Sequence, residues 1–330
     1  MKMKWYKLPC KRSELQLVGT LNGGQSFRWK KTVSDDKEQW IGVFSKRVWT
    51  LQQEDDFLLY TVHENKTNNL CQEEEESYYN TLLRNYFQLD VNLGELYSQW
   101  SESDQYFKEA AKQFYGIRIL KQEVTENIFS FICSSNNHIS RISSMVEKLA
   151  NYYGEEICEL NGEKYYSFPK VELLAQESVE EKLRTNKFGY RAKYISKSAQ
   201  HITNSGCEEW INKLETMPYE SAKRELMLLT GIGAKVADCI CLMSLGHLDA
   251  IPVDTHIYQI AKKLYLPKLP DNKTVNEKVY NEIGDHFRNL YGPLAGWAHT
   301  VLFCADLKKF QGNNIGNDTD SNLKKKKKKN

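Results

Sequence analysis

The chain has 330 residues, of which 41% are hydrophobic and 27% charged, and its formal net charge is +2. At roughly 150 residues per domain, this length predicts about two domains. No apolar run approaches the ~18 residues of a membrane span, and no apolar secretory stretch follows the N-terminus, so we expect no membrane partner. The eight cysteines form no Cys-x-x-Cys pair, which predicts reduced thiols and argues against a zinc ribbon or an iron–sulfur loop.

The first third of the chain predicts β-strands. Short runs rich in β-branched and aromatic residues lie at 26–29, 40–44, 48–51 and 57–62, with turn-forming segments between them. Their alternation is imperfect, which indicates an antiparallel sheet partly covered on both faces. The acidic run at 73–76 predicts a solvated loop or the start of a helix.

From about residue 77 the apolar spacing becomes helical. Further helical blocks are predicted at about 102–115, 123–133, 139–152, 190–203, 219–229, 235–245, 255–264 and 274–290. We therefore predict an α+β fold with an N-terminal antiparallel β domain and flanking helices at 1–115 and a helical domain at 116–311. A disordered, lysine-rich tail is predicted at 312–330.

The most informative segment is a predicted helix–turn–helix at about 219–245. Gly231 and Gly233 flank Ile232 in the turn, where glycine permits a tight bend with outward-facing amides. Amides at a helix N-terminus form a ready phosphate site. The same spacing also fits an ordinary αα-hairpin that binds nothing.

Three residues around this turn are candidates for chemistry. Lys235 opens the second helix, where a cation opposes the helix dipole, and Cys239 lies one turn further on the same face. A solvated lysine and a small buried cysteine are the structural alternatives. Asp254 precedes a predicted helix, so it fits an N-cap and a catalytic carboxylate equally well.

Two further segments combine polar and aromatic residues. The break at 133–138 contains Asn136 and is followed by Arg141, and the segment 189–194 interleaves Tyr190 and Arg191 with other aromatic and basic residues. A capped loop and an exposed helix start would explain them structurally. Base stacking with phosphate or base contacts is the functional interpretation.

Taken together, these motifs resemble the helix-hairpin-helix DNA glycosylases, and most closely the 8-oxoguanine DNA glycosylase/AP lyases. The resemblance extends over residues 8 to about 310 in the order of the family. It is carried by the segments 23–29, 133–137, 189–194, 231–243, 252–256 and 296–306.

The resemblance implies excision of 8-oxoguanine opposite cytosine, with associated β-elimination. Lys235 would attack the sugar C1′ and form a Schiff base, and Asp254 would stabilise the developing positive charge. A carboxylate near Lys235 favours its charged form, whereas attack requires the neutral amine. No cofactor or catalytic metal is implied.

Recognition residues follow from the same resemblance. The Gly24 carbonyl would meet the N7 hydrogen of the oxidised base, the base would stack between Phe303 and Cys239, and Asp306 and His299 would complete the pocket. The expected DNA contacts are Asn136 in the vacated gap, Tyr190 as a wedge, Arg141 and Arg191 at the orphan cytosine, and Gly231, Gly233 and His256 at phosphates.

One residue departs from the family pattern. His299 stands where the family usually has a glutamine that reads the Watson–Crick edge of the base. A neutral imidazole also offers one donor and one acceptor, but on a rigid ring. We therefore predict retained activity with a changed base preference or a pH sensitivity near 6.5. His138 also departs from the asparagine run, with no assigned consequence.

Three alternatives remain open at this stage. A relative that removes another damaged base with aspartate and water is opposed by Lys235, and an endonuclease III-like relative is opposed by the missing cysteine cluster. A non-catalytic module that binds duplex DNA is the alternative from a different class. The expected partner is double-stranded DNA containing oxidised guanine, bound by a monomer. The lysines at 324–329 predict a nuclear location, with mitochondrial copies as an alternative.

Overall fold

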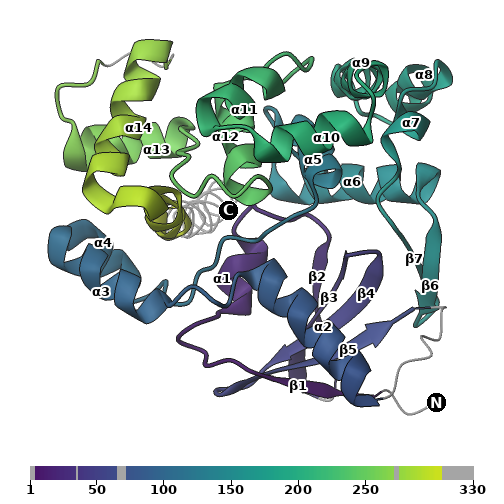
Figure 1. Cartoon of the computed structure of the whole chain (residues 1–330), viewed down its shortest axis with the longest axis horizontal. Coiled ribbons are helices and arrows are strands. Elements are labelled where there is room, and N and C mark those ends of the chain that lie inside the picture. Colours follow the sequence, from purple (N-terminus) through teal and green to yellow (C-terminus); the bar gives the residue numbers. More distant parts are fainter. Residues whose placement is uncertain (1–3, 35, 65–71, 271–274, 307–330) are drawn as a thin grey trace, which may run out of the picture.

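The computed structural model describes residues 4–34, 36–64, 72–270 and 275–306. A five-stranded antiparallel sheet is followed by a mainly helical body, which confirms the predicted α+β fold (Figure 1). The strand order is β1-β5-β4-β3-β2. The strands are β1 (Tyr6–Pro9), β2 (Trp29–Ser34), β3 (Lys37–Phe44), β4 (Arg47–Gln53) and β5 (Phe57–His63). The predicted tail at 312–330 lies outside the described residues.

Both faces of the sheet are covered, which explains the imperfect alternation in its strands. Trp49 and Leu51 of β4 pack in a cluster with Leu83 and Phe87 of helix α2 (Gln72–Phe87). On the other face, Val48 packs with residues of a two-stranded hairpin, β6 (Glu156–Leu160) and β7 (Glu163–Tyr166). The acidic run at 73–76 lies in the first turn of α2, where negative charge complements the helix dipole.

The prediction from sequence omits three strands and places a fourth a few residues too early. Strands β1, β6 and β7 were not predicted, and residues 26–28 form bends before β2 instead of a strand. Tertiary contacts explain the bends, because the Gln25 side chain donates to the Arg118 carbonyl at 2.7 Å and accepts from the Leu120 amide at 2.9 Å. A single sequence does not reveal such long-range partners.

The body consists of helices joined by short loops. Its longer helices are α5 (Val124–Ser134), α6 (Ile139–Tyr153), α9 (Arg191–Asn204), α10 (Glu208–Thr216), α11 (Tyr219–Leu226), α12 (Ala234–Met243) and α14 (Glu277–Tyr291). Its shorter elements are α7 (Val171–Leu174), α8 (Ser178–Thr185), α13 (Thr255–Ile260), η1 (Ala261–Tyr265) and η2 (Gly292–Leu294). Helix α1 (Leu17–Asn22) lies between β1 and β2 and packs with the sheet instead. Residues 295–306 form a further helix. The predicted helical blocks near 123, 139, 190, 219, 235, 255 and 274 all correspond to helices.

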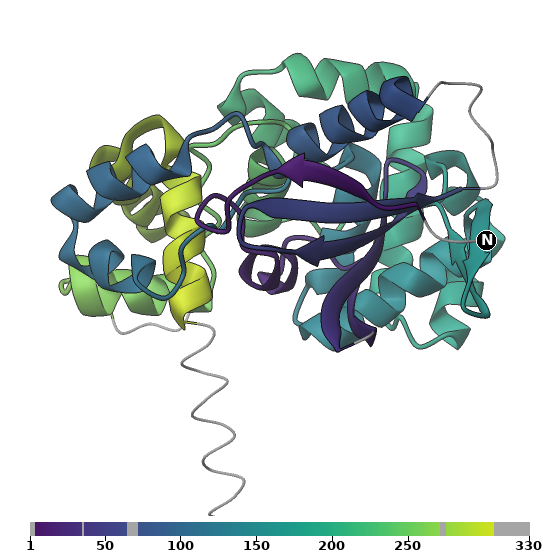
Figure 2. The same ribbon diagram turned by 90° about the horizontal axis from the view of Figure 1, so that it is seen from below.

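Helices α3 (Leu93–Ser103) and α4 (Gln105–Ala111) replace the single block predicted at 102–115. They extend beside α13 and α14 and away from the sheet (Figure 2). The Trp100 indole donates to the Tyr291 carbonyl at 3.3 Å, so these helices share the core of the body. The boundary near residue 115 stays a prediction.

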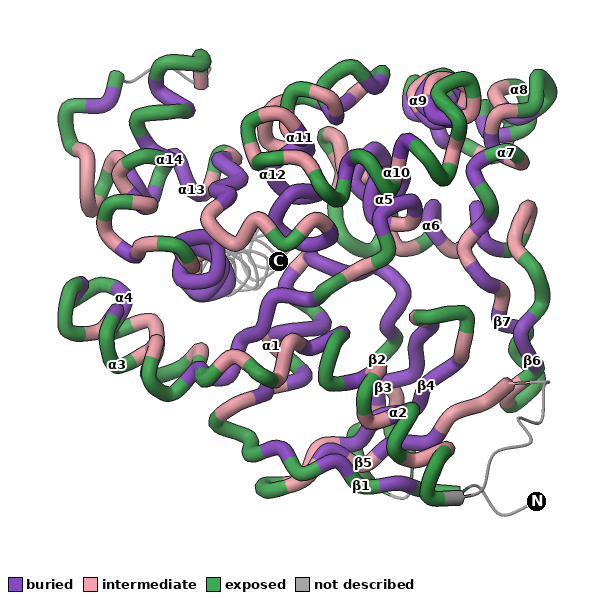
Figure 3. The backbone as a smooth tube through the Cα atoms, in the orientation of Figure 1, coloured by how far each residue is buried: buried purple, intermediate pink, exposed green. Residues whose placement is uncertain are grey.

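The last described helix packs in the middle of the molecule, against the segment that leads into α5. Trp297 is fully buried and its indole donates to the Ile117 carbonyl at 2.7 Å. The helix that contains it is buried along almost its whole length (Figure 3). Among the described residues, no helix has the length and apolar character that crossing a bilayer requires.

Candidate active site

The predicted hairpin is formed by α11, a short turn and α12. Gly231 has φ +89°, and a Cβ added there would lie 2.3 Å from the Tyr194 ring of α9. The Thr230 carbonyl accepts from the Ser198 hydroxyl at 3.0 Å, so α9 supports the turn from behind. Gly233 caps α12 with φ −100°, and a Cβ there would meet no atom within 4 Å. The first glycine is therefore required by backbone and packing, and the second leaves space in front of the helix amides.

This difference between the two glycines predicts a larger loss of stability for alanine at position 231 than at position 233. Gly231→Ala should lower the free energy of unfolding by about 2–4 kcal/mol, because it adds a strained backbone and a clash with Tyr194. Gly233→Ala, which meets no clash but places a poorer residue at the N-cap of α12, should lower it by only about 0.5–1 kcal/mol. Urea unfolding of the two variants tests this, and equal stabilities would contradict the tight packing at Gly231.

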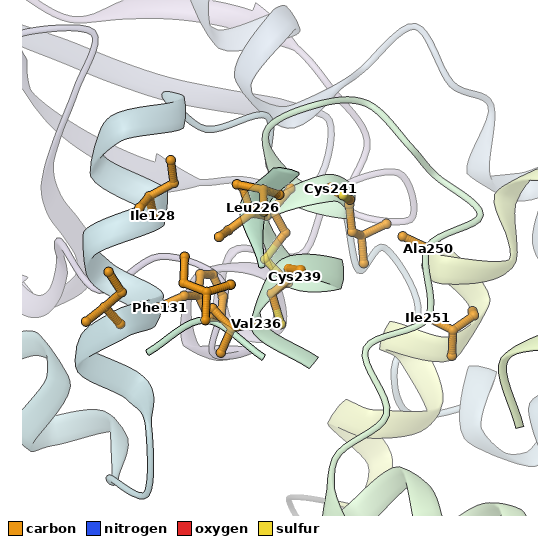
Figure 4. Packing of buried hydrophobic residues seen from close by; sticks show 14 of the residues in the cluster. Ile128, Phe131, Leu226, Val236, Cys239, Cys241, Ala250 and Ile251 are labelled. Atoms are coloured by element: carbon orange, nitrogen blue, oxygen red, sulfur yellow. The ribbon is translucent and has the colours of Figure 1, made fainter. Parts of the chain in front are cut away.

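Lys235 lies in the first turn of α12 and is half-buried. Its Nζ lies 5.4 Å from the ring centroid of Phe131 on α5. Figure 4 shows Phe131 beside Val236 and Cys239, so an apolar wall adjoins the amine. Cys239 is buried on the same face of α12, one turn after Lys235, as the helical spacing predicted.

The charges around Lys235 determine its resting state. Burial alone lowers the pKa of the Lys235 ammonium, but Cys239 and the Asp254 carboxylate raise it, so the pKa lies above that of an ordinary lysine. Burial raises the pKa of the Cys239 thiol to about 11, and Lys235 opposes this shift. At neutral pH the site therefore holds an ammonium beside a neutral thiol, and nucleophilic attack requires a prior proton transfer.

Asp254 combines the two roles that its sequence allowed. It is the N-cap of α13, and its Oδ1 accepts from the Ile257 amide at 2.9 Å. Its carboxylate is also close enough to Lys235 to raise the pKa of the amine. The structure thus brings together the two predicted catalytic residues, which are 19 positions apart in the chain.

His299 lies on the helix at 295–306 and is buried, with 4% of its surface exposed. Neither ring nitrogen has a hydrogen-bond partner of good geometry among the described residues, although the Pro252 carbonyl lies close enough to affect the ring. Burial, assisted by Lys235, lowers the pKa of His299 to about 4, although Asp254 and the Pro252 carbonyl act in the opposite direction. The expected pH sensitivity near 6.5 is therefore corrected: the ring stays neutral throughout the physiological range.

The same helix brings Phe303 and Asp306 to His256. The Phe303 ring meets the His256 ring edge-on at 6.0 Å between centroids, and His256 Nδ1 lies 3.1 Å from Asp306 Oδ2. His256 is two residues from Asp254, so this group adjoins the catalytic pair. Asp306 thus orients His256 and is not itself an isolated carboxylate.

Gly24 belongs to a segment that packs against both sides of the site. Its φ is +74°, and a Cβ added there would face open space. A Cβ on the preceding Gly23 would lie 3.3 Å from the sulfur of Cys304, next to Phe303. Phe27 meets Phe131, the neighbour of Lys235, edge-on at 5.8 Å. The Gly24 backbone is therefore both open to a ligand and close to the catalytic helices.

A second group of predicted residues lies where α5 ends and α9 begins. Asn136 is exposed and has φ +45°, in the left-handed region. The hydroxyl of the exposed Tyr190 donates to the Ser135 carbonyl at 3.0 Å. Arg141 is exposed and donates to the Lys187 carbonyl at 3.2 Å. Since α5 also carries Phe131, this group is connected to the catalytic site.

Arg191 differs from its expected position at an orphan base. It is 3% exposed, and its guanidinium donates to the Ser135 carbonyl and, at 2.9 Å, to the Asn136 carbonyl. In this structure it holds the strained Asn136 backbone in place. Contact with a cytosine would require these bonds to be exchanged.

Two residues that adjoin the site, Phe131 and Asp238, were not predicted from the sequence. Phe131 appeared only as an apolar helical residue, and nothing local marks it as the neighbour of Lys235. Asp238 is fully buried among apolar neighbours on α12, with polar partners on α11 and α14. Its position on an otherwise apolar helix was the available signal.

Away from the hairpin, the described residues form a cavity but no cluster of metal-ligating side chains. Within the described ranges, no three His, Cys, Asp or Glu residues are grouped so that they could hold a metal ion. A cavity of about 950 Å³ lies between the β3–β4 turn and α10, lined by residues that include Arg47, Glu126 and Lys170. None of the predicted site residues lines it.

The geometry defines a helix-hairpin-helix body with a lysine at the hairpin and an aspartate near enough to raise its pKa, and comparison with known proteins agrees. Residues 129–283 match the family described as HhH-GPD superfamily base excision DNA repair protein. Residues 7–128 match the 8-oxoguanine DNA glycosylase N-terminal domain. The chain belongs to the 8-oxoguanine DNA glycosylase family of this superfamily.

Two curated relatives cover most of the chain. The N-glycosylase/DNA lyase OGG1 of Arabidopsis thaliana is 37% identical over 308 residues, which cover 92% of this chain and 80% of that protein. The N-glycosylase/DNA lyase of Saccharomyces cerevisiae is 36% identical over 362 residues, which cover 99% of this chain and 92% of that protein.

Solved structures show the same likeness. MBOgg1 in complex with a low-affinity DNA ligand has a TM-score of 0.78 and 31% identity, covering 94% of this chain and 99% of that one. The Clostridium acetobutylicum 8-oxoguanine glycosylase/lyase, in complex with double-stranded DNA containing cytosine opposite 8-oxoG, has a TM-score of 0.76 and 28% identity. It covers 90% of this chain and 93% of that one.

Proposed function

We propose that this protein is a base-excision enzyme that removes 8-oxoguanine opposite cytosine from duplex DNA and then cleaves the strand at the abasic site. The observation that supports this proposal best is the position of Lys235: it opens the second helix of the hairpin, beside Phe131 and Cys239, and is near enough to Asp254 for the carboxylate to raise its pKa. A binding module needs only the hairpin amides, whereas an amine and a carboxylate held together in a half-buried site supply a nucleophile and a charge stabiliser.

The chemistry starts from the neutral amine of Lys235. Its lone pair forms a bond to the sugar C1′ as the C1′–N9 bond breaks, and the departing base takes up a proton. The C1′–O4′ bond then opens as the Lys235 nitrogen loses a proton and O4′ gains one, which leaves a protonated Schiff base between Lys235 and C1′. Loss of a C2′ proton then breaks the C3′–O bond and expels the 3′ phosphate.

Asp254 has two tasks in this sequence. Its carboxylate stabilises the positive charge that develops on the sugar, and it is a nearby acceptor for the proton that the Lys235 ammonium must lose. This resolves the conflict between a charged resting lysine and a neutral nucleophile, because the proton lost by the amine balances the proton gained by the leaving base.

The proposed base pocket uses the backbone and two helices. The Gly24 carbonyl would accept the N7 hydrogen that distinguishes 8-oxoguanine from guanine, since the open space above this residue lets a ligand approach the backbone. Phe303 and Cys239 would stack on the flipped base, and stacking of ~1–3 kcal/mol offsets much of the cost of flipping.

The proposed DNA surface follows from the exposed residues. Asn136 would fill the vacated gap, Tyr190 would wedge beside it and Arg141 would contact the orphan cytosine. Arg191 supports this surface by holding the Asn136 backbone, and we retain its cytosine contact as part of the proposal. The amides at Gly231 and Gly233, together with His256, would hold phosphates.

His299 is proposed to read the edge of the flipped base in place of glutamine. We expect His299→Gln to shift the ratio of kcat/KM between 8-oxoguanine and a second oxidised purine by about 10-fold, because glutamine presents its donor and acceptor on a flexible chain. The rate profile between pH 5.5 and 8 should not change, since the native ring is neutral there. Competition assays with both bases test this, and an unchanged preference would contradict it.

The same variant has a predicted effect on stability. Because the pKa of His299 falls from 6.5 to about 4 on folding, the unfolded chain binds an extra proton in this window and stability declines as pH falls. The difference corresponds to about 3 kcal/mol. His299→Gln should therefore flatten the dependence of the unfolding free energy on pH between 6.5 and 4.

A borohydride trapping assay tests the proposed function. The protein is mixed with an end-labelled duplex that carries one 8-oxoguanine opposite cytosine, and the matched duplex carries guanine. We expect a covalent band and base release with the oxidised duplex only. No band but released base, scored as abasic sites, would indicate hydrolysis without a Schiff base. Tight binding with neither product would indicate a non-catalytic DNA-binding module. A third duplex that carries an alkylated base tests for the related glycosylases, which would release that base and not 8-oxoguanine.

The cellular location, the oligomeric state and the partners of the enzyme are proposals as well. We propose a nuclear, monomeric enzyme that acts on duplex DNA without a membrane partner, on the basis of the lysines at 324–329 and the absence of any requirement for a second chain in the described site. Sedimentation with and without duplex DNA, and imaging of the full chain against a version with these lysines replaced by serine, test the two statements.

A further inference from the structure

A buried polar cluster lies one turn beyond Lys235 and has no task in the steps above. Its centre is Asp238 on α12, which is fully buried. Asp238 accepts from the Tyr219 hydroxyl at 2.6 Å, from Lys223 Nζ at 2.9 Å and from the Tyr280 hydroxyl. The cluster therefore joins the helix of the nucleophile to both α11 and α14.

Tyr280 extends this cluster to the other catalytic residue. Its hydroxyl, which donates to Asp238, also accepts from the Val253 amide at 3.2 Å. Val253 directly precedes Asp254. One hydroxyl group thus connects the helix that carries Lys235 with the backbone that carries Asp254, and both Tyr280 and Val253 are less than 10% exposed.

Stability alone does not explain a carboxylate at this place. The pKa of Asp238 is raised by burial, against the opposing effects of Lys223 and the two tyrosines, so the carboxylate carries a desolvation cost. Apolar side chains of similar volume commonly replace buried ion pairs without loss of stability. The surrounding core of α12 is apolar (Figure 4). Directed hydrogen bonds supply what apolar packing does not, namely a defined distance and orientation.

We propose that Tyr280 is a positioning residue whose hydroxyl, held between Asp238 and the Val253 amide, sets the separation of Lys235 from Asp254. The inference rests on the proposed function. Proton transfer from the ammonium and stabilisation of the sugar cation both require Asp254 at a defined distance from the amine, and a misplacement of ~1 Å costs about 100-fold in rate.

The test is Tyr280→Phe in the full chain. It removes one oxygen and keeps the ring in the core. We expect single-turnover release of 8-oxoguanine to slow by about 10- to 100-fold. The Kd for a duplex that carries an uncleavable abasic analogue should stay within about twofold, because the hydroxyl that is removed bonds to Asp238 and to the backbone of Val253 and Ile251, none of which is a proposed DNA-binding residue. A residue with a purely structural role would not separate rate from binding in this way.

Tyr291→Phe is the matched control. Tyr291 is also a buried tyrosine of α14, and its hydroxyl also donates to a buried aspartate, Asp104, which lies outside the site. Both variants should lose similar stability, but only Tyr280→Phe should lose rate. An unchanged rate in Tyr280→Phe, or equal rate losses in both variants, would overturn the proposal.

A second variant covers the case in which Tyr280→Phe does not fold. Lys223→Met, Asp238→Leu and Tyr280→Phe in combination replace the cluster by apolar packing and leave no buried charge unpaired. This variant should fold, bind the analogue and show the same loss of rate, and a wild-type rate would overturn the proposal. Wild type and Tyr291→Phe report separately on the function itself: if neither forms a covalent adduct with 8-oxoguanine DNA, the proposed function fails and not merely the role of Tyr280.

Discussion

Lys235→Gln is expected to abolish the borohydride-trapped adduct and to slow base release by at least about 10³-fold, the largest effect of any single substitution in this chain. Glutamine nearly matches lysine in reach, but its amide nitrogen has no free lone pair with which to attack C1′. Trapping on denaturing gels and single-turnover base release with the 8-oxoguanine duplex measure the two effects.

Two controls make the loss specific. Lys213→Gln removes an exposed lysine at the end of α10 and should leave the adduct unchanged. The unfolding free energy of Lys235→Gln should stay within about 1 kcal/mol of the native value, because the ammonium it replaces already carries a desolvation cost. A full-strength adduct in Lys235→Gln would show that a different amine is the nucleophile.

Asp254→Asn is expected to give the second-largest loss, a reduction of about 10²- to 10⁴-fold in base release. Asparagine keeps an oxygen for the Ile257 amide, so the N-cap of α13 is retained and stability should change by less than about 0.5 kcal/mol. The substitution therefore removes the charge while preserving the cap, and it separates the two roles of Asp254. Base release and urea unfolding measured on the same preparation provide the test.

Asn276 supplies the matched control for this variant. Its side chain caps α14 through an equivalent bond to the Val279 amide at 2.9 Å and is not the hydrogen-bond partner of any residue proposed for the chemistry. Asn276→Ala should cost about 1 kcal/mol of stability and leave the rate unchanged. If Asp254→Asn keeps the native rate, Asp254 is a helix cap alone and the electrostatic part of the mechanism is wrong.

The elements that surround the hairpin were predictable because their determinants are local. Helices α11 and α12 were placed within a few residues by apolar spacing and by the glycines of the turn, and the cap at Asp254 needs only its own neighbours. The strand β1 and the β6–β7 hairpin were missed because they are short and are stabilised by partners far along the chain.

Sequence motifs could predict which residues belong to the candidate site, but not the burial and hydrogen bonds of those residues. The motifs identified Lys235 and Asp254, and the structure brings them together. Burial lowers the pKa of His299, and two backbone carbonyls accept hydrogen bonds from Arg191. Both effects arise only when α5, α9 and the helix at 295–306 are packed. Asp238 and Tyr280 are 42 residues apart, and no local pattern relates a buried aspartate to a tyrosine on another helix.

The packing of the last described helix against early parts of the chain has a consequence for how the protein is made. Gly23 is synthesised early and Cys304 late, yet the two lie side by side, and His299 of the same late helix is close enough to Lys235 for the amine to affect its pKa. A chain that stops before residue 295 already contains the whole hairpin and its lysine, but it lacks the buried Trp297 that anchors Ile117 and the aromatic side of the pocket. Because a domain generally folds as a unit, a partly synthesised chain carries the nucleophile without a completed pocket. Reactivity toward DNA and discrimination between bases are thereby acquired together, when the last helix packs.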